Sequence, residues 1–468
     1  MAEREFDVVV IGAGAPGEVC AGRAAGGGLE VAIVEEHLLG GECSYYACMP
    51  SKALLRPGEL LAEVRRVPGV RDAVTGELDV EAALTRRDEV IHDLDDSSQV
   101  PWLEDRGIEI FRGTGRIDGE RRVRVGDDTL VARRAVVVGT GTVPAIPPID
   151  GLADAKPWGN YEATTAKRTP KSLVVLGGGF VGAEMAQAWR TLGSEVVLIE
   201  AEDRILSPEE PFASEQVAEG LREIGVDVRT GAKASAVRAG NGTVSVELEG
   251  GDEVSGEQLL VAVGRKPNTD DIGIESVGVE PGPRGFLEVD DQLRVRTQPR
   301  DVQAHRAVSD WLHAVGDVNG RALLTHMGKY QGRIAADHIL GKDVAATEDH
   351  HAVPRVVFTE PQVAAVGRTL AAAKEDGLNA RAVDVPTSGT AGASFTGRNA
   401  PGTSRLVVDE DRRVLVGATF VGPETAEWVH AATIAVVGEV PLERLWHAVP
   451  SFPTRSEVWL YLLEEYGL

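Results

Sequence analysis

The chain has few cysteines and no long hydrophobic run. Its 468 residues include only three cysteines, too few for the disulfide framework of a small secreted protein. No apolar stretch approaches the roughly 20 residues that a membrane helix needs, and the amino terminus, MAEREFDVVVIGAG, lacks the apolar core of a signal peptide. We therefore expect a cytoplasmic protein without a membrane partner, in which a close cysteine pair is redox-active or binds a metal.

Positive charge is also scarce. The formal net charge of −25 would repel nucleic acid and anionic lipid, and the sequence contains no basic patch to offset it. The chain is too long for one compact core, so about two to four domains are expected. Its 54 glycines indicate many tight turns, so the positions of the glycines become informative.

Glycines recur in two similar segments, residues 6–36 and 172–200. In each, an apolar run leads into a GxGxxG turn, an amphipathic stretch, and a second apolar run that ends in an acid. Matched positions are offset by 165 residues, as from 12 to 177 and from 35 to 200. The matched residues are Gly12, Gly14, Gly17 and Glu35 in the first segment, and Gly177, Gly179, Gly182 and Glu200 in the second.

This order predicts a strand, turn, helix and strand that bind a dinucleotide. The first glycine permits the turn, the second lets a pyrophosphate approach the backbone, the third brings helix and strand together, and the acid accepts from a ribose. A hairpin and an apolar strand follow each copy, at residues 122–138 and 243–261. Two dinucleotide-binding domains imply electron transfer between a flavin and a nicotinamide.

Six motifs carry a family resemblance: GAGAPG, GGECSYYACMPSK, VVVGTGTVPAIP, GGGFVGAE, VGRKPN and AVGDVNG. In this order they resemble the flavin-dependent pyridine nucleotide–disulfide oxidoreductases, the group of dihydrolipoamide dehydrogenase, glutathione reductase and mercuric reductase. The resemblance covers nearly the whole chain. It implies an α/β fold with two Rossmann-like domains, for FAD and NAD, and a carboxy-terminal α+β dimerisation domain in a homodimer. The implied boundaries are 1–160 and 286–345 for FAD, 161–285 for NAD(P), and 350–468 for the interface.

The resemblance also assigns cofactor residues. For FAD it implies pyrophosphate, ribose, adenosine-side and ribityl contacts from Gly12, Gly14, Gly17, Glu35, Gly115 and Asp317. For the nicotinamide dinucleotide it implies Gly177, Gly179, Gly182 and Glu200. Further cofactor candidates in the same motifs are Gly41, Lys52, Thr140, Gly141 and Gly264. Lys52 and Glu184 resemble an ion pair beside the reactive edge of the flavin, although a solvated lysine and a surface glutamate are the simpler interpretation.

Cys43 and Cys48 fit a dithiol that takes two electrons from reduced flavin and passes them to an acceptor. Residues five apart diverge on a regular helix, so a disulfide requires an irregular turn, which Gly40, Gly41 and Pro50 make plausible. A thiol at a helix amino terminus beside a flavin is expected to have a lowered pKa.

By resemblance, Cys48 lies against the flavin and Cys43 exchanges with substrate. The alternatives are a metal pair, for which further ligands are not evident, and two inert buried thiols. Cys20, on the first predicted helix, is expected in the core.

The carboxy terminus departs from the family. Members that act on thiols end in His-Pro followed four residues later by Glu, and the histidine is the acid–base. Here the sequence is HAVPSFPTRSEVWL, and aligning Pro453 and Glu457 places Phe452 at the histidine position. Phenylalanine cannot transfer a proton, and losing such a base typically costs about 100- to 10,000-fold.

Other residues could supply the proton. His447 lies five residues upstream, although an interface histidine is the simpler interpretation. Tyr45 and Tyr46 lie between the cysteines, and either phenol could donate a proton or stack on a flat substrate, although packing under the flavin is the simpler interpretation.

Three functions follow from this pattern. The first is a dihydrolipoamide dehydrogenase-like enzyme that passes electrons between NAD(P)H and a small-molecule disulfide or dithiol. The second is an NADH-dependent quinone or metal-ion reductase that needs no thiol acid–base. The third is a non-catalytic flavin-bound redox sensor, against which the two intact cofactor motifs argue.

The nicotinamide is expected to be NAD(H). Glu200 accepts from a ribose 2′-hydroxyl and repels a 2′-phosphate. Ala201 follows where an NADP enzyme is expected to have arginine, although Arg204 nearby keeps NADP(H) open. The segment near residues 296–310 is longer than the family leads us to expect, and its role is not evident from the sequence.

Overall fold

The computed structural model describes residues 3–297, 308–398 and 400–468. The chain forms two compact units, which are described separately. Unit 1 comprises Met1–Pro50, Asp88–Pro144 and Arg265–His350. Unit 2 comprises Ser51–Arg87, Ala145–Gly264 and His351–Leu468. The domain boundaries given above are a finer division and stay a prediction, and most of the long segment near 296–310 lies outside the described residues.

Unit 1 is built on an eight-stranded sheet that includes the path β16-β17-β6-β1-β2-β3, with the β4–β5 hairpin attached to β6. The central strands β1 and β2 are parallel, as are β1 and β6. Strands β7 and β15 form a separate antiparallel pair. The strands are β1 (Glu3–Ile11), β2 (Val31–Glu35), β3 (Ile108–Arg112), β4 (Gly115–Ile117), β5 (Arg122–Val125), β6 (Asp128–Val138), β7 (Thr142–Pro144), β15 (Arg265–Pro267), β16 (Arg294–Arg296) and β17 (Val308–Ala314).

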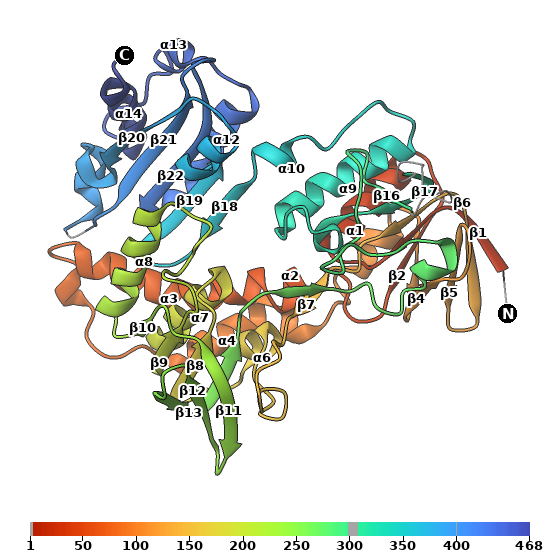
Figure 1. The fold of residues 1–468 in the computed structure, drawn as a ribbon, viewed down its shortest axis with the longest axis horizontal. Coiled ribbons are helices and arrows are strands. Elements are labelled where there is room, and N and C mark those ends of the chain that lie inside the picture. Colours follow the sequence, from red (N-terminus) through yellow and green to blue (C-terminus); the bar gives the residue numbers. More distant parts are fainter. Residues whose placement is uncertain (1–2, 298–307, 399) are drawn as a thin grey trace. The chain divides into compact units, whose positions relative to one another are not determined.

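Helices α1 and α9 pack side by side in unit 1 (Figure 1). Gly332 permits this approach, because a Cβ there would lie 2.5 Å from the carbonyl oxygen of Pro16. Cys20 is fully buried in the core beneath them, as expected. The helices of unit 1 are α1 (Ala15–Gly26), α2 (Gly41–Tyr45), α5 (Val100–Glu104) and α9 (Thr325–Ile339). Three helices cross the boundaries between units along the chain: α3 (Cys48–Arg66), α4 (Val80–Val90) and α10 (Glu348–His351).

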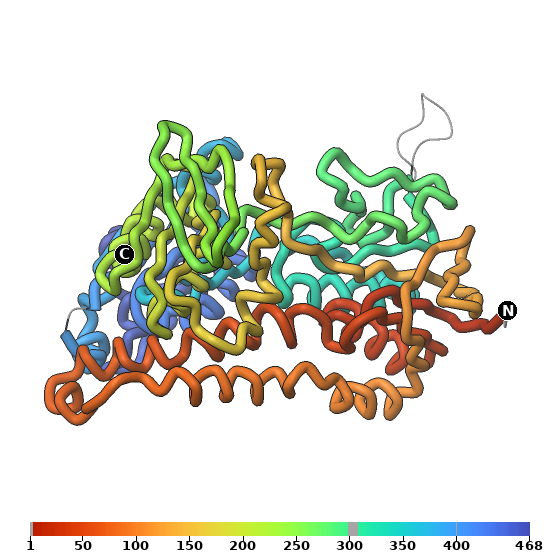
Figure 2. Tube along the Cα trace, turned by 90° about the horizontal axis from the view of Figure 1, so that it is seen from below, coloured from red at the N-terminus to blue at the C-terminus, as the bar shows by residue number. Residues whose placement is uncertain are grey.

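The described residues of unit 2 form three sheets. The first is parallel, with order β10-β9-β8-β14; the second is the antiparallel β11-β12-β13, seen in green in Figure 2; the third has order β18-β19-β22-β21-β20. The strands are β8 (Ser172–Leu176), β9 (Glu195–Ile199), β10 (Asp227–Arg229), β11 (Ala234–Gly240), β12 (Thr243–Leu248), β13 (Glu253–Gly256), β14 (Gln258–Val261), β18 (Pro354–Val357), β19 (Gln362–Gly367), β20 (Ala380–Pro386), β21 (Thr403–Asp409) and β22 (Val414–Gly422).

The helices of unit 2 cover these sheets. They are α6 (Asn160–Thr165), α7 (Phe180–Thr191), α8 (Pro211–Glu223), α11 (Leu370–Glu375), α12 (Val429–Val437), α13 (Leu442–Leu445) and α14 (Val458–Tyr466). Strand β22 is buried along its whole length, because it lies between β19 and β21 and because helices α12 and α8 also pack on it. The apolar carboxy-terminal helix expected at VWLYLLEEY is α14.

The internal repeat is present in the fold. Strand β1, helix α1 and strand β2 form the first copy, and β8, α7 and β9 form the second, each with parallel strand pairing. Both expected hairpins are also present, β5–β6 in unit 1 and β12–β13 in unit 2. The mixed α/β architecture with two Rossmann-like halves and a separate carboxy-terminal sheet is therefore confirmed.

Candidate active site

The first glycine of each turn adopts a left-handed conformation that a side chain would strain. The φ angle is 99° at Gly12 and 103° at Gly177. A Cβ on Gly12 would lie 2.4 Å from the carbonyl oxygen of Gly139, and one on Gly177 would lie 2.5 Å from that of Ala262. Both turns therefore require glycine for the same two reasons, backbone angle and a neighbouring strand.

The second and third glycines differ in their surroundings. A Cβ on Gly17 would lie 2.0 Å from the oxygen of Gly12, and one on Gly182 would lie 1.8 Å from the oxygen of Gly177. These positions bring the helix against the turn. By contrast, no atom lies within 4 Å of a Cβ placed on Gly179, and only a proline carbon at 3.9 Å approaches one on Gly14. Open space remains where a pyrophosphate would approach the backbone.

The two acids hold the turns in matching ways. Glu35 accepts hydrogen bonds from the amides of Ala13 (2.7 Å) and His37 (2.8 Å). Glu200 accepts them from Gly178 (2.6 Å) and Glu202 (2.8 Å), which are the same positions plus 165. Burial raises the pKa of Glu35. Each carboxylate is thus fixed at the end of its second strand, where a ribose hydroxyl would meet it.

The other predicted FAD residues gather in unit 1. Gly41 packs directly against the first glycine turn, since a Cβ on Gly41 would lie 2.6 Å from the Cα of Gly14. Gly115 packs on Ile11 and Val34, and Gly141 (φ 70°) has no atom within 4 Å of a Cβ. The Thr140 hydroxyl donates to the carbonyl oxygen of Asn268 at 2.7 Å.

Asp317 lies on the short 3-10 turn Gly316–Asn319. The Gln331 side chain holds this turn by accepting from the Gly316 amide and from the Asn319 side chain, both at 2.8 Å. Burial raises the pKa of Asp317, and the nearby Arg265 opposes that shift. A half-buried carboxylate held by Thr142, next to the open Gly141, fits a hydroxyl-rich cofactor chain, so the residues of unit 1 fit FAD.

The two cysteines lie on either side of a helix break. Cys43 is on α2 and Cys48 is the first residue of α3, with Tyr46 and Ala47 between the helices. Gly40 (φ 97°) and Gly41 (φ 65°) start α2 in left-handed conformations. The irregular turn that the spacing required is therefore present.

Both sulfurs are thiols and they interact with one another. A hydrogen bond with Cys48 is the largest cause that raises the pKa of Cys43, followed by burial and by the Cys48 charge. The expectation of a lowered pKa is therefore wrong for Cys43, because the neighbouring sulfur and burial both raise its pKa. The Cys48 sulfur also lies 3.4 Å from the Thr325 hydroxyl, a contact that the sequence did not predict.

Lys52 and Glu184 form an ion pair within unit 2. The Lys52 Nζ lies 2.7 Å from Glu184 Oε2, and the glutamate side chain is 6% exposed. The amide of Phe358 donates to the other carboxylate oxygen at 3.0 Å. The lysine ammonium lies 4.7 Å from the centre of the Phe358 ring. The simpler interpretation, a solvated lysine and a surface glutamate, is wrong.

The possible substitutes for the missing histidine differ in accessibility. Tyr45 is 1% exposed and its hydroxyl has no hydrogen-bond partner among the described residues, so this phenol does not face solvent. Burial raises the pKa of Tyr45 to about 12. Tyr46 is half-buried, and His447 is exposed. Phe452 is 77% exposed.

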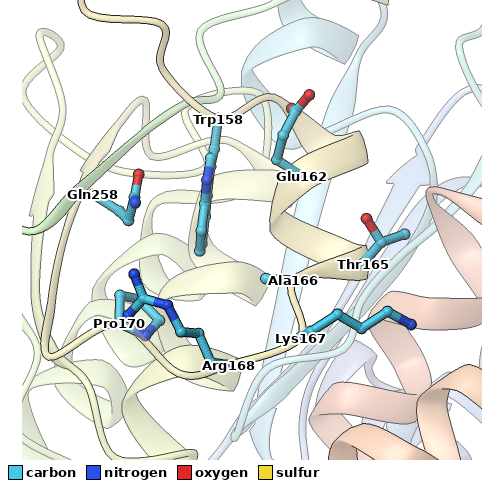
Figure 3. A pocket seen from close by; sticks show the side chains of 8 residues that line it. All are labelled: Trp158, Glu162, Thr165, Ala166, Lys167, Arg168, Pro170 and Gln258. Carbon is cyan, nitrogen blue, oxygen red and sulfur yellow. The ribbon is translucent and has the colours of Figure 1, made fainter.

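A pocket of about 480 Å³ lies elsewhere in unit 2 (Figure 3). In this view the Trp158 side chain lies between those of Gln258 and Glu162, and Arg168 lies below them. None of the residues that line it is a predicted site residue.

One ion pair of unit 1 was missed by sequence analysis. Arg265 pairs with Glu42, the residue before Cys43, and also donates to the Thr142 hydroxyl at 2.5 Å. The only sequence signal was an acid within GGEC and an arginine within VGRKPN, 223 residues apart. Nothing in their spacing indicates contact.

In the part of the chain that the structure describes, no helix is long and apolar enough to span a membrane. No group of three or more His, Cys, Asp or Glu residues is arranged to hold a metal ion among residues 3–297, 308–398 and 400–468.

Known proteins resemble the chain along almost its whole length. It is 32% identical over 463 residues to a dihydrolipoyl dehydrogenase of Haloferax volcanii, covering 96% of this chain and 94% of that protein. It is 29% identical to a mercuric reductase of Staphylococcus aureus, covering 97% and 81%. The HOCl-induced flavoprotein disulfide reductase RclA from Escherichia coli is 25% identical, with a TM-score of 0.84 over 98% of this chain and 99% of that structure.

Family models match both parts of the chain. Residues 6–332 match pyridine nucleotide-disulphide oxidoreductase, and residues 353–462 match the dimerisation domain of the same family. The family, fold class and enzyme class predicted from the motifs are confirmed. The chain therefore belongs to the pyridine nucleotide-disulphide oxidoreductase family and is an FAD-dependent disulfide oxidoreductase.

Proposed function

We propose that this enzyme oxidises NADH and passes the electrons to a small-molecule acceptor through the Cys43–Cys48 couple. The observation that carries the proposal is the position of two interacting thiols at the break between α2 and α3, in the unit that holds the FAD-type turn. Bound FAD would supply the two-electron carrier between nicotinamide and thiols. The protein's own contribution is to hold two dinucleotides and one dithiol.

The protonation of the couple supports distinct roles for its thiols. The raised pKa of Cys43 results from a hydrogen bond with Cys48 and from a Cys48 charge. A raised pKa favours the protonated thiol at Cys43, so the two sulfurs of the couple are not equivalent.

Three features of unit 2 support NADH over NADPH. Glu200 is an anion fixed at the end of β9, where it would accept from a ribose hydroxyl and repel a phosphate. Ala201 follows it directly. Arg204, which kept NADPH open, donates to the carbonyl oxygens of Glu209 (2.9 Å) and Ser207 (2.5 Å). Its guanidinium is engaged by the loop rather than presented to a 2′-phosphate.

The dimerisation domain supports a homodimer. Its described residues include several large apolar side chains that are strongly exposed in the single chain. They are Phe395 (71%), Ile434 (58%), Val449 (85%) and Phe452 (77%). A monomeric protein seldom exposes so much apolar surface in one domain, and a second subunit would cover it.

Two acceptor classes are compatible with the site. The retained thiols favour a disulfide or dithiol as the acceptor. The name of the dihydrolipoyl dehydrogenase relatives indicates a substrate of this kind. Phe452 favours a second candidate, a quinone or metal ion, because such an acceptor needs no thiol acid–base. The mercuric reductase relative and a Cu(II) complex of RclA are in accord with a metal-ion acceptor.

Turnover assays separate the two candidates. Purified enzyme is supplied with NADH and either lipoamide or a benzoquinone, and wild type is compared with Cys48→Ser. The disulfide function requires lipoamide turnover that disappears in the variant. Quinone turnover that survives the substitution, with no lipoamide turnover in wild type, would favour the second function.

Phe452→His restores the missing base and tests why it is absent. If the natural acceptor is a disulfide handled without this base, the variant should gain about 100-fold or more in lipoamide turnover. His447→Ala is the matched control, and we expect it to leave turnover unchanged. A fall in lipoamide turnover in His447→Ala would instead identify His447 as the acid–base.

A further inference from the structure

One arginine of unit 1 links the thiol segment to the predicted FAD site. Glu42 precedes Cys43 on α2, and its carboxylate forms an ion pair with Nη2 of Arg265. The two side chains are only 22% and 19% exposed. Such a pair is shielded from solvent, so the charge of each partner acts on its neighbours with little screening.

The same guanidinium reaches the cofactor side. Its Nε donates to the Thr142 hydroxyl at 2.5 Å and Nη2 donates to the Thr142 carbonyl oxygen at 2.7 Å. That hydroxyl donates in turn to Asp317 Oδ2 at 3.0 Å, and Arg265 Nε lies 4.0 Å from the same oxygen. The chain Glu42–Arg265–Thr142–Asp317 is therefore continuous.

Strand pairing fixes this chain in place. Arg265 begins β15, which pairs antiparallel with β7, the strand that Thr142 begins. Thr142 is 5% exposed, so its hydroxyl has no access to water as an alternative partner. The Thr142 hydroxyl accepts a hydrogen bond from Arg265 and donates its only proton to Asp317.

We propose that Glu42 and Arg265 are positioning residues for the flavin site, in which one guanidinium shared by two carboxylates holds Asp317 ready to accept from the ribityl chain of FAD. The proposal rests on the FAD site proposed above, and goes beyond it by adding two residues that act on FAD through Asp317. Glu42, the residue before Cys43, would thus contribute indirectly to FAD binding.

The electrostatic effects of the two partners on Asp317 are opposite. The positive charge of Arg265 and the Thr142 hydrogen bond lower the pKa of Asp317, whereas burial and the negative charge of Glu42 raise it. Removing Arg265 should therefore let Asp317 take up a proton at higher pH. Removing the charge of Glu42 should have the reverse effect, because Arg265 then acts on Asp317 alone.

Opposite shifts provide the test. FAD binding to the apoprotein is titrated by flavin fluorescence across pH, with circular dichroism to confirm that the fold persists. FAD affinity should fall at low pH, when Asp317 becomes protonated. For Arg265→Met we expect the midpoint of this fall to shift upward by about one to three pH units, the usual effect of losing an opposite charge at this distance. For Glu42→Gln we expect a smaller shift to lower pH.

Matched controls come from an exposed pair of the same unit. Arg4 and Glu109 form an ion pair whose side chains are 42% and 41% exposed, and Arg4→Met and Glu109→Gln should leave the FAD titration unchanged. Shifts in the same direction for Arg265→Met and Glu42→Gln would mean that the pair is merely structural and would overturn the proposal. Unaltered FAD affinity in Asp317→Asn would instead overturn the FAD site itself.

Discussion

The two dinucleotide-binding halves share a turn but use the following segment differently. Their glycines have matching φ angles, and their acids accept from amides at matching positions, 13 and 178, then 37 and 202. The segments directly after these positions differ. At the position of Cys43, unit 2 has Pro208, and the buried acids Glu209 and Glu210 follow it.

Those acids anchor the carboxy-terminal sheet within unit 2. Glu209 makes a bidentate pair with Arg355 of β18 at 2.7 and 3.2 Å. Glu210 pairs with Arg405 of β21 at 2.8 Å. The comparison teaches that the first and third glycines of the turn cannot vary, because a backbone oxygen occupies the space of a Cβ at each. The next segment carries thiols in one half and ion-paired acids in the other.

Breaking an anchor should have the largest effect on stability. Glu209→Ala leaves the Arg355 guanidinium without its bidentate partner in a largely buried position, which typically costs about 3–5 kcal/mol of unfolding free energy. Cys43→Ser, in the corresponding segment of unit 1, should cost less than about 1 kcal/mol. Denaturant unfolding of both holoenzymes measures the difference. Equal losses of unfolding free energy in the two variants would show that the segment in unit 2 is no more important for stability than the thiol segment in unit 1.

The third glycines should separate the two cofactors. Gly17→Ala and Gly182→Ala each force a Cβ onto a backbone oxygen. The resulting strain of about 3 kcal/mol should weaken binding of the dinucleotide at that turn by roughly 100-fold. We expect Gly17→Ala to lose FAD, seen as loss of flavin absorbance. Gly182→Ala should keep FAD but resist reduction by NADH under anaerobic conditions.

Two other glycines are controls for that pair. Gly26 ends α1 and Gly240 ends β11, and a Cβ at either would meet no atom within 4 Å. Alanine at these positions should change neither cofactor. If Gly182→Ala lost FAD as well, the assignment of one dinucleotide to each half would be wrong.

Much of this architecture could be predicted because it rests on local backbone demands. GxGxxG spacing, apolar runs and a terminal acid are short-range signals, and the structure has β1–α1–β2 and β8–α7–β9 where they predicted them. The break at Gly40 and Gly41 was also predictable, since the cysteine spacing excludes a regular helix.

The rest depends on contacts between distant segments. The hydrogen bond that raises the pKa of Cys43, the burial of Tyr45 and the Glu42–Arg265 pair arise only when the chain folds. A rule for an isolated helix terminus predicted a lowered pKa, whereas the neighbouring sulfur and burial raise the pKa of Cys43. The sequence shows residue types, whereas the protonation of a site depends on what surrounds each group.

Glu200 should have a smaller, specific effect. Its carboxylate can hydrogen-bond a ribose hydroxyl, and such bonds to charged groups contribute about 1.5–3 kcal/mol. Glu200→Ala should therefore narrow the preference for NADH over NADPH by at least about tenfold in kcat/KM. Glu35→Ala, the matched change in the FAD half, should leave the nicotinamide ratio as it is. An unchanged ratio in Glu200→Ala would show that other residues choose the nicotinamide.

The smallest expected effect concerns the thiols that only unit 1 carries. Cys48→Ala removes both the hydrogen bond and the charge that raise the pKa of Cys43. Since a thiolate forms above the pKa, the pH midpoint for alkylation of Cys43 in the reduced enzyme should fall. A fall of about one unit would correspond to an interaction of ~1.4 kcal/mol. Iodoacetamide labelling followed by peptide mass spectrometry measures Cys43 alone.

Cys20→Ala is the control for this titration, because Cys20 is fully buried in the core of unit 1 and burial raises its pKa to about 12. It should leave the Cys43 midpoint where it is in wild type. A midpoint that stays unchanged in Cys48→Ala would mean that burial alone governs Cys43. The two sulfurs would then titrate independently, and the division of roles between them would lose its electrostatic basis.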